Sequence, residues 1–184
     1  MQPLRQDIVE ISGQNLTIEQ VVCVSRNGAK VGLSSDAIER MARGRAILEA
    51  AIARGERIYG ATTSVGPKTT ATINQANTAE FSRRLLRTHN AGHGPVAARD
   101  VTRATMLNLL NSLASGTTGV RPGLAERLLD ALNADRPVVM HLWGSMGQSD
   151  MSSMADVALA LFDDIELEAG EALALLNSSA MSTA

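Results

Sequence analysis

The chain has 184 residues, enough for one domain or for a large part of one. Hydrophobic residues make up 45% of it but Phe, Trp and Tyr only 2%, so its apolar residues are mainly helix formers, which disfavours a β-sandwich or barrel. A net charge of −2 with acids and bases interspersed excludes the electrostatic footprint of a nucleic-acid-binding protein.

The N-terminal third is predicted to contain one short strand and two helices. Residues 7–12, DIVEIS, alternate between polar and apolar and predict a strand that ends at Gly13. Thr17 and Gln20 have the spacing of a capping box and predict a helix through about residue 25. Ser34 begins a longer helix, which Gly55 ends. The apolar face of that helix carries Ile38, Met41, Leu48 and Ile52.

The rest of the chain is predicted to be a loop followed by helices. The loop, YGATTSVGPKTTATI, is rich in Gly and Thr and has no periodicity. Helices are predicted at about 75–88, 97–115, 122–133, 152–162 and 166–184. Two of them have apolar stripes, Met106, Leu109, Leu110 and Leu113 in one and Leu124, Leu128, Leu129 and Leu132 in the other. We therefore predict a mainly α protein with short strands near the N-terminus, and residues 1–184 as a single region without a linker.

Both ends of the chain carry information about location and partners. The N-terminus has no basic-then-apolar signal pattern, and no run of about 18 apolar residues occurs, so we expect a soluble cytoplasmic protein without membrane contacts. One cysteine, Cys23, excludes an internal disulfide and is expected to be a buried thiol. The final segment, EALALLNSSAMSTA, stays apolar and helical to the last residue. Either this terminus frays or the fold continues in another polypeptide, and the pattern favours the second.

Two motifs suggest nucleotide or metal binding, but their details do not fit. The stretch from Gly60 to Lys68 has one residue too many between its glycines for a phosphate loop, and Pro67 removes an N–H that should face phosphate. His89 and His93 have the spacing of ligands on a helix, but the glycines around them disfavour a helix and no carboxylate or cysteine lies nearby. We expect neither nucleic acid, nucleotide nor metal.

Two further residues are candidate catalytic groups. Tyr59, the only tyrosine, lies at the start of the Gly/Thr loop, where it is either a general base or an aromatic ring packed at a loop entrance. Ser149 lies in GSMGQSDMS at 144–152, which suggests a nucleophile elbow. The motif G-x-S-x-G is absent, because Met151 stands where the second glycine belongs. A serine hydrolase is therefore disfavoured.

Taken in order, these segments resemble the N-terminal portion of the histidine and phenylalanine ammonia-lyase family of aromatic amino acid lyases and aminomutases. The similarity runs through LTIEQVV at 16–22, RGERIYGATTSVG at 54–66, LLRTHNAGHG at 85–94, TGVRPGLAERLLDALNADRPVV at 118–139, GSMGQSDM at 144–151 and EALALLNSSAMSTA at 171–184. The resemblance implies an elongated helical bundle that assembles as a tetramer. It also implies elimination of ammonia by a methylidene-imidazolone electrophile (MIO), a ring that forms from an internal Ala-Ser-Gly triad.

The resemblance assigns roles to individual residues. Tyr59 matches the catalytic base in the Tyr-Gly loop, and Gly66 matches the glycine that ends that loop. His89 matches the histidine that borders the substrate ring, and Asn177 matches the asparagine close to the electrophile. Ser149 matches the serine of the triad.

The chain departs from the family pattern at the triad. Gln148 replaces the alanine, and the glycine is either replaced by Asp150 or deleted. Ring closure needs the amide nitrogen of the third residue to reach the carbonyl of the first, and glycine permits that compressed backbone because it lacks a Cβ. We therefore predict that no MIO forms and that no other cofactor is used, with Gln148 beside the substrate. The Tyr loop also differs, with TTSVG at 62–66 where the family commonly has Asn-Thr-Gly-Phe-Gly.

The sequence leaves three functional hypotheses. The chain is one subunit of a split, MIO-less lyase-like enzyme, in which Tyr59 serves as base for elimination, conjugate addition or cyclisation on an activated small molecule. Alternatively, it is a non-catalytic scaffold or regulatory pseudoenzyme of the same fold. The third hypothesis is a genuine MIO-dependent lyase with a ring derived from Gln-Ser-Asp. Family members are far longer, so a companion chain is expected to supply the C-terminal half in a hetero-oligomer with a tetrameric core.

Overall fold

A computed structural model describes residues 8–184 of the chain. It is mainly helical, with four short strands. The elements are β1 (Val9–Ile11), α1 (Ile18–Ser25), β2 (Val31–Leu33), α2 (Ser35–Ala53), η1 (Gly66–Lys68), η2 (Gln75–Asn77), α3 (Thr78–His89), β3 (His93–Val96), α4 (Arg99–Ala114), α5 (Pro122–Asn133), β4 (His141–Trp143), α6 (Met151–Phe162), α7 (Glu171–Leu176) and α8 (Ala180–Thr183). The predicted fold class is confirmed.

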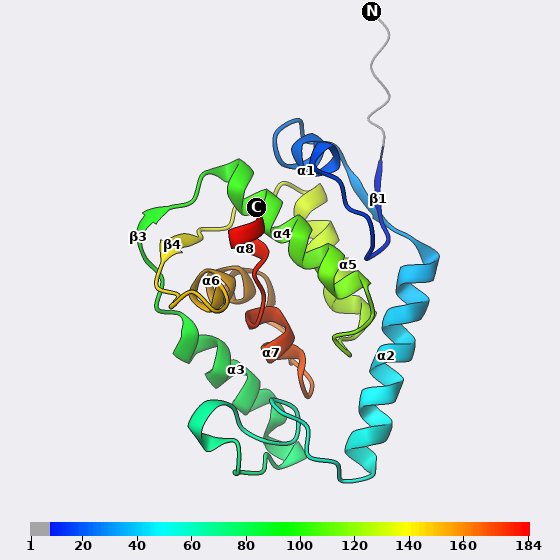
Figure 1. Cartoon of the computed structure of the whole chain (residues 1–184), viewed down its shortest axis with the longest axis vertical. Helices are drawn as coiled ribbons and strands as arrows, with labels where there is room; N and C mark the ends of the chain where they lie inside the picture. The colour runs from blue at the N-terminus through cyan, green and yellow to red at the C-terminus, as the bar shows by residue number, and fades with distance from the viewer. Residues whose placement is uncertain (1–7) are drawn as a thin grey trace, which may run out of the picture.

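Helix α4 forms the centre of the fold, with α1, α5 and α8 packed around it (Figure 1). Its stripe of Met106, Leu109, Leu110 and Leu113 is buried, as the spacing of these residues predicts. A second layer is formed by α3, α6 and α7, which pack against one another. Helix α2 runs along one edge of the molecule, and the loop of residues 54–77 connects its end to α3 at the bottom of the view.

Local sequence signals set most helix boundaries. Thr17 and Gln20 form the predicted capping box at the start of α1, and the Ser34 side chain caps α2 by accepting the N–H of Ala37. Pro122 occupies the first turn of α5, where its missing N–H costs no helical hydrogen bond. These predictions are confirmed.

Four features differ from the sequence prediction. The N-terminal strand β1 is shorter than the predicted strand at 7–12, whose first residue lies outside the described residues. Its parallel partner β2 was not predicted. The antiparallel pair β3–β4 was not predicted either, since its strands are short and far apart in the chain. Cys23 is partly exposed rather than buried. The single helix predicted at 166–184 is wrong, because the segment breaks into α7 and α8.

The break between α7 and α8 has a local cause. Asn177 and the two serines after it compete with the helix for backbone hydrogen bonds, and Asn177 adopts a non-helical ψ of 70°. The carbonyl of Ser178 then accepts the N–H of Asp150 at 2.8 Å, outside the helix. The C-terminal segment is therefore anchored to the start of α6.

Candidate functional site

Tyr59 lies in a tightly folded loop between α2 and α3. The carbonyl of Ile58 accepts the N–H groups of Ala61, Thr62 and Thr63 at 2.9–3.1 Å, and the Thr62 hydroxyl caps the N–H of Ile58 at 2.8 Å. The Tyr59 hydroxyl oxygen accepts the N–H of Gly66 at 2.9 Å, while the residue as a whole is 52% exposed. The ring is thus held in position, with its hydroxyl proton free for another acceptor.

Gly60 brings this loop against α7. Its φ is +73°, and a Cβ at this position would lie 2.4 Å from Cδ2 of Leu173. The positive φ favours glycine, and a Cβ here would also force the Leu173 side chain to shift. The residue next to Tyr59 is fixed by the helix that precedes Asn177.

Tyr59 and Asn177 line the same cavity of about 250 Å³. The cavity lies between the Tyr59 loop, the C-terminal half of α2, α7 and the end of α4. Most of its other lining residues are apolar or small: Leu48, Ile58, Ala61, Ser112, Thr118, Gly170, Leu173 and Ala174. A mostly apolar hollow with a few polar groups is the usual form of a small-molecule site.

Two polar residues of this cavity were not predicted. The Thr118 hydroxyl oxygen is buried and has no hydrogen-bond partner within residues 8–184, and Ser112 lies beside it in the lining. A buried hydroxyl without a partner costs free energy unless a ligand or water satisfies it. No sequence pattern marks Thr118, because it lies in a Gly/Thr turn whose place in this cavity is a tertiary feature.

The loop at 144–150 does not line the Tyr59 cavity. Gln148 is exposed and Ser149 is half-buried. Asp150 is only 4% exposed, and its carboxylate accepts the backbone N–H of Ser182 at 2.8 Å as well as the Ser182 hydroxyl. The 177–182 segment therefore touches both places, with Asn177 at the Tyr59 cavity and Ser178 and Ser182 at Asp150.

His89 is the last residue of α3 and lies outside the residues that line the Tyr59 cavity. Its ring Nδ1 lies 2.8 Å from the Leu85 carbonyl oxygen. The turn after it is anchored by Asp156, whose carboxylate accepts the Asn90 side-chain amide at 2.6 Å and lies 2.9 Å from the His141 ring. The structure therefore gives His89 a well-fixed position but does not bring it to Tyr59.

A buried ion pair holds α7 against the start of α5. Glu171 is fully buried, and its carboxylate accepts Nε and Nη2 of Arg121 at 2.9 and 2.8 Å. The backbone N–H groups of Arg121 and Glu168 also donate to it. The hydrogen bond to Glu171 raises the pKa of Arg121 above its ordinary value. This network positions α7, whose Leu173 lines the Tyr59 cavity and which ends just before Asn177.

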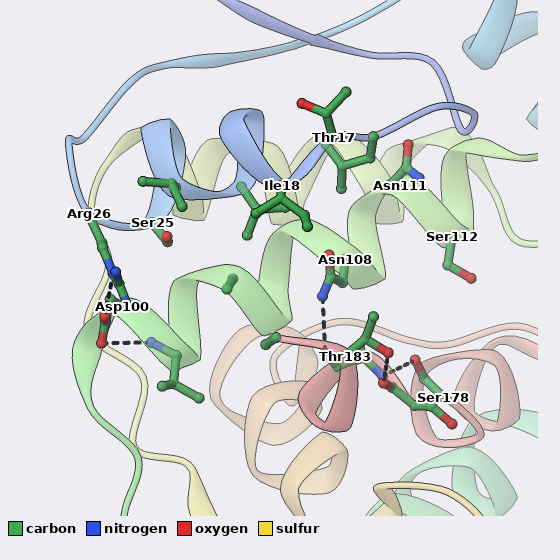
Figure 2. Close-up of a pocket in the computed structure, with 18 of the residues that line it drawn as sticks. Thr17, Ile18, Ser25, Arg26, Asp100, Asn108, Asn111, Ser112, Ser178 and Thr183 are labelled. Atoms are coloured by element: carbon green, nitrogen blue, oxygen red, sulfur yellow. Dashed lines mark hydrogen bonds and ion pairs between the residues drawn. The ribbon is translucent and has the colours of Figure 1, made fainter.

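A larger cavity, about 840 Å³, lies between α1, α4 and α8 and shares Ser112 with the Tyr59 cavity (Figure 2). An ion pair between Arg26 and Asp100 closes one end of it, and the Asn108 amide donates to the Ala180 carbonyl in its middle. Ile18, on α1, lines it while remaining 79% exposed. None of the predicted site residues lines this groove. Tyr59 and Asn177 line the smaller cavity instead.

Within residues 8–184, no group of three or more His, Cys, Asp or Glu side chains is arranged to hold a metal ion. In the same part of the chain, no helix is both long and apolar enough to cross a membrane.

Comparison with known proteins shows the family of the chain. Residues 16–164 match the sequence profile of a family described as aromatic amino acid lyase. The chain belongs to this family. It is 40% identical to histidine ammonia-lyase of Streptomyces griseus over 161 residues, which are 87% of this chain but 31% of that enzyme. The chain therefore spans about a third of the length of such a relative.

Solved structures of lyases and aminomutases show the same fold. Ergothionase from Treponema denticola superimposes with a TM-score of 0.91 at 25% identity, over 95% of this chain and 40% of that one. Tyrosine aminomutase from Streptomyces globisporus gives 0.89 at 30% identity, over 96% and 38%. Almost the whole of this chain thus matches about two-fifths of each of these structures.

The family's electrophile can now be tested against the residues in its place. If Asp150 takes the place of the triad glycine, ring formation would need its amide nitrogen to attack the Gln148 carbonyl, whereas in the structure that N–H donates to the Ser178 carbonyl. The Asp150 side chain is buried and bonded to Ser182. A side chain at this position obstructs the compressed backbone that glycine permits. The side chains of Gln148 and Asp150 thus differ from those of the Ala-Ser-Gly triad that forms the ring in the family.

Proposed function

We propose that the chain is one subunit of a two-chain, MIO-less ammonia-lyase-like enzyme in which Tyr59 transfers a proton. The observation that carries this proposal is the cavity that Tyr59 and Asn177 share. The presence of Gln148 and Asp150 where the family has alanine and glycine supports the absence of the electrophile. Its substrate is a small molecule that is already activated. The reaction is an elimination, a conjugate addition or a cyclisation.

The requirement for an activated substrate follows from the missing electrophile. A proton on an unactivated carbon is weakly acidic and an amine leaves poorly, so a base alone does not deaminate an ordinary aromatic amino acid. A substrate with its own carbonyl or conjugated double bond supplies the needed electron sink. Tyr59 then has only to remove or deliver a proton at the carbon next to that group.

The position of Tyr59 supports this role. Its hydroxyl is fixed by the Gly66 N–H, which accounts for the place of Gly66 in the site. Asn177 lines the same cavity and can donate or accept a hydrogen bond, and the Thr118 hydroxyl needs a partner. We assign Tyr59 as the base and Asn177 as a substrate-binding residue. We place His89, Gln148 and Ser149 at the margin of the site.

A companion chain is part of the proposal. This chain spans 31% of the Streptomyces griseus enzyme and 40% of ergothionase, and those proteins carry the remaining part of the fold in the same polypeptide. The groove between α1, α4 and α8 leaves the apolar Ile18 and Val22 open to solvent. We propose that the companion covers this groove, within a hetero-oligomer that keeps a tetrameric core.

Two observations favour the alternative of a non-catalytic scaffold. The predicted substrate neighbour His89 does not line the Tyr59 cavity. The loop that carries Tyr59 has also lost the asparagine, the first glycine and the aromatic residue of the family's Asn-Thr-Gly-Phe-Gly. In this alternative the chain serves only to build an oligomer, and the Tyr59 hydroxyl only stabilises its own loop through the hydrogen bond from Gly66.

Deuterium exchange separates the two functions. The chain, co-purified with its companion, is incubated in deuterium oxide with a panel of ring-bearing amino acids and their unsaturated and keto analogues, and carbon-bound deuterium is read by mass spectrometry. We expect incorporation in at least one compound and a loss of roughly 100-fold or more in Tyr59→Phe. His93→Gln, an exposed histidine outside the cavity, serves as the control and should keep the activity. Equal exchange in Tyr59→Phe and the wild type would eliminate Tyr59 as the base.

A further inference from the structure

Three cations stand apart from all other lysines and arginines of residues 8–184. The side chains of Lys68, Arg83 and Arg84 make no hydrogen bond and no ion pair in this part of the chain, whereas the side chain of every other Lys or Arg there makes at least one. All three side chains belong to exposed residues. Two of them, Lys68 and Arg84, line the same cavity.

This cavity, of about 280 Å³, lies between the loop that carries Tyr59 and the first turns of α3. Lys68 reaches it from η1, and Arg84 from α3. Its apolar part consists of the buried Phe81 and the half-buried Ile73. Hydroxyl and amide side chains complete the lining: Ser64, Thr72, Asn74 and Asn77.

The charges of the cavity are unbalanced. Glu80 also lines it, one helical turn before Arg84, but the two do not come within ion-pair distance. Two cations therefore face one carboxylate, and neither cation is neutralised by its neighbours. Elsewhere in the described chain such cations are paired, as Arg87 is with Asp163.

We propose that this cavity binds a small organic carboxylate with a compact apolar or aromatic body. The carboxylate would lie between Lys68 and Arg84, which can both donate charge-assisted hydrogen bonds to it. The body of the ligand would pack on Phe81 and Ile73. Glu80 disfavours a dianion such as phosphate, because it leaves a net charge of only one positive unit in the lining.

The cavity is separate from the proposed active site. It shares no lining residue with the cavity of Tyr59 and Asn177. The inference does not rest on the proposed function. The two are nevertheless connected by η1, because Lys68 ends that turn and Gly66, which begins it, donates to the Tyr59 hydroxyl. A ligand held by Lys68 and Arg84 would tie η1 to α3, and so make the Tyr59 loop responsive to the ligand.

Saturation-transfer NMR with benzoate tests the site, using the full chain with whatever companion co-purifies. We expect benzoate to bind, and its neutral isostere benzamide to bind at least about tenfold more weakly. Lys68→Gln and Arg84→Gln should each weaken benzoate binding by roughly threefold to tenfold. Arg83→Gln is the matched control, because Arg83 is equally exposed and unpaired but does not line the cavity, and it should leave binding unchanged.

The same experiment can overturn the proposal. Benzoate binding that survives both Lys68→Gln and Arg84→Gln would place the ligand elsewhere. An equal loss of benzoate affinity in all three variants would mean that only the overall charge of the protein matters. Benzamide binding as tight as benzoate binding would mean that the carboxylate is not recognised. Inorganic phosphate binding more tightly than benzoate would refute the proposed class of ligand. Thermal unfolding of each variant checks that the fold is intact. Because the replaced side chains are exposed and unpaired within the described residues, the melting temperature should not change.

Discussion

Replacing Asp150 by alanine tests whether this residue has become a structural anchor at the place where the family builds its electrophile. The carboxylate is 4% exposed and accepts both the N–H and the hydroxyl of Ser182. Hydrogen bonds to a charged group contribute about 1.5–3 kcal/mol each. Because α8 lies close to the surface, the lower value applies to each bond, and Asp150→Ala should lower the free energy of unfolding by about 3 kcal/mol.

The neighbouring serine supplies the matched control. Ser149 is half-buried and makes no side-chain hydrogen bond within the described residues. Ser149→Ala should therefore change the free energy of unfolding by less than about 0.5 kcal/mol. For a chain of this size, the expected difference corresponds to a lower melting temperature by roughly 6–12 °C in Asp150→Ala.

Urea unfolding followed by circular dichroism measures both variants. The transition of Asp150→Ala should move to lower urea with an unchanged slope, since the surface exposed on unfolding stays the same. Unfolding free energies of the two variants within about 0.5 kcal/mol of each other would refute the reasoning. The hydrogen bonds of Asp150 to Ser182 would then contribute nothing measurable to stability, and Asp150 would have no structural role at the triad position.

Two further substitutions test the placement of the Tyr59 cavity. Gly60→Ala should destabilise the protein by about 3 kcal/mol, since it adds a clash with Leu173 to the cost of a positive φ. Gly55→Ala, with a φ of +76° and no atom near its Cβ, should cost only about 1–2 kcal/mol, and thermal unfolding should separate the two. Glu171→Gln should cost about 2–3 kcal/mol in urea unfolding, because it removes the buried charge that pairs with Arg121 and leaves Arg121 paired only with Glu168. A loss below about 0.5 kcal/mol would contradict a positioning role for the Arg121–Glu171 ion pair.

Local patterns predicted the helices because their causes are local. The capping residues Thr17 and Ser34 and the apolar stripe of α4 act within a few turns of one chain segment, so the sequence alone shows them. The strands β3 and β4 are paired by residues far apart in sequence, and β3 has no buried face to give it a pattern. The break after α7 begins locally at Asn177, but the hydrogen bond from the Asp150 N–H to the Ser178 carbonyl, which anchors the segment after the break, is a tertiary contact.

The site shows the same division. Family resemblance singled out Tyr59 and Asn177, and the structure places them at one cavity although they are far apart in the chain. It does not bring His89, Gln148 or Ser149 to that cavity. Thr118 escaped prediction because a threonine in a glycine-rich turn becomes a candidate only when its hydroxyl is buried without a partner. Burial and pairing are properties of the packed chain.

The intact mass of the purified chain tests the central claim most directly. Formation of an MIO ring removes two molecules of water from the polypeptide. We predict a mass equal to that of the unmodified sequence, both for the chain alone and for the chain isolated with its companion. A mass lower by two waters, located by peptide mapping to residues 148–150, would show that the ring forms and would contradict the account.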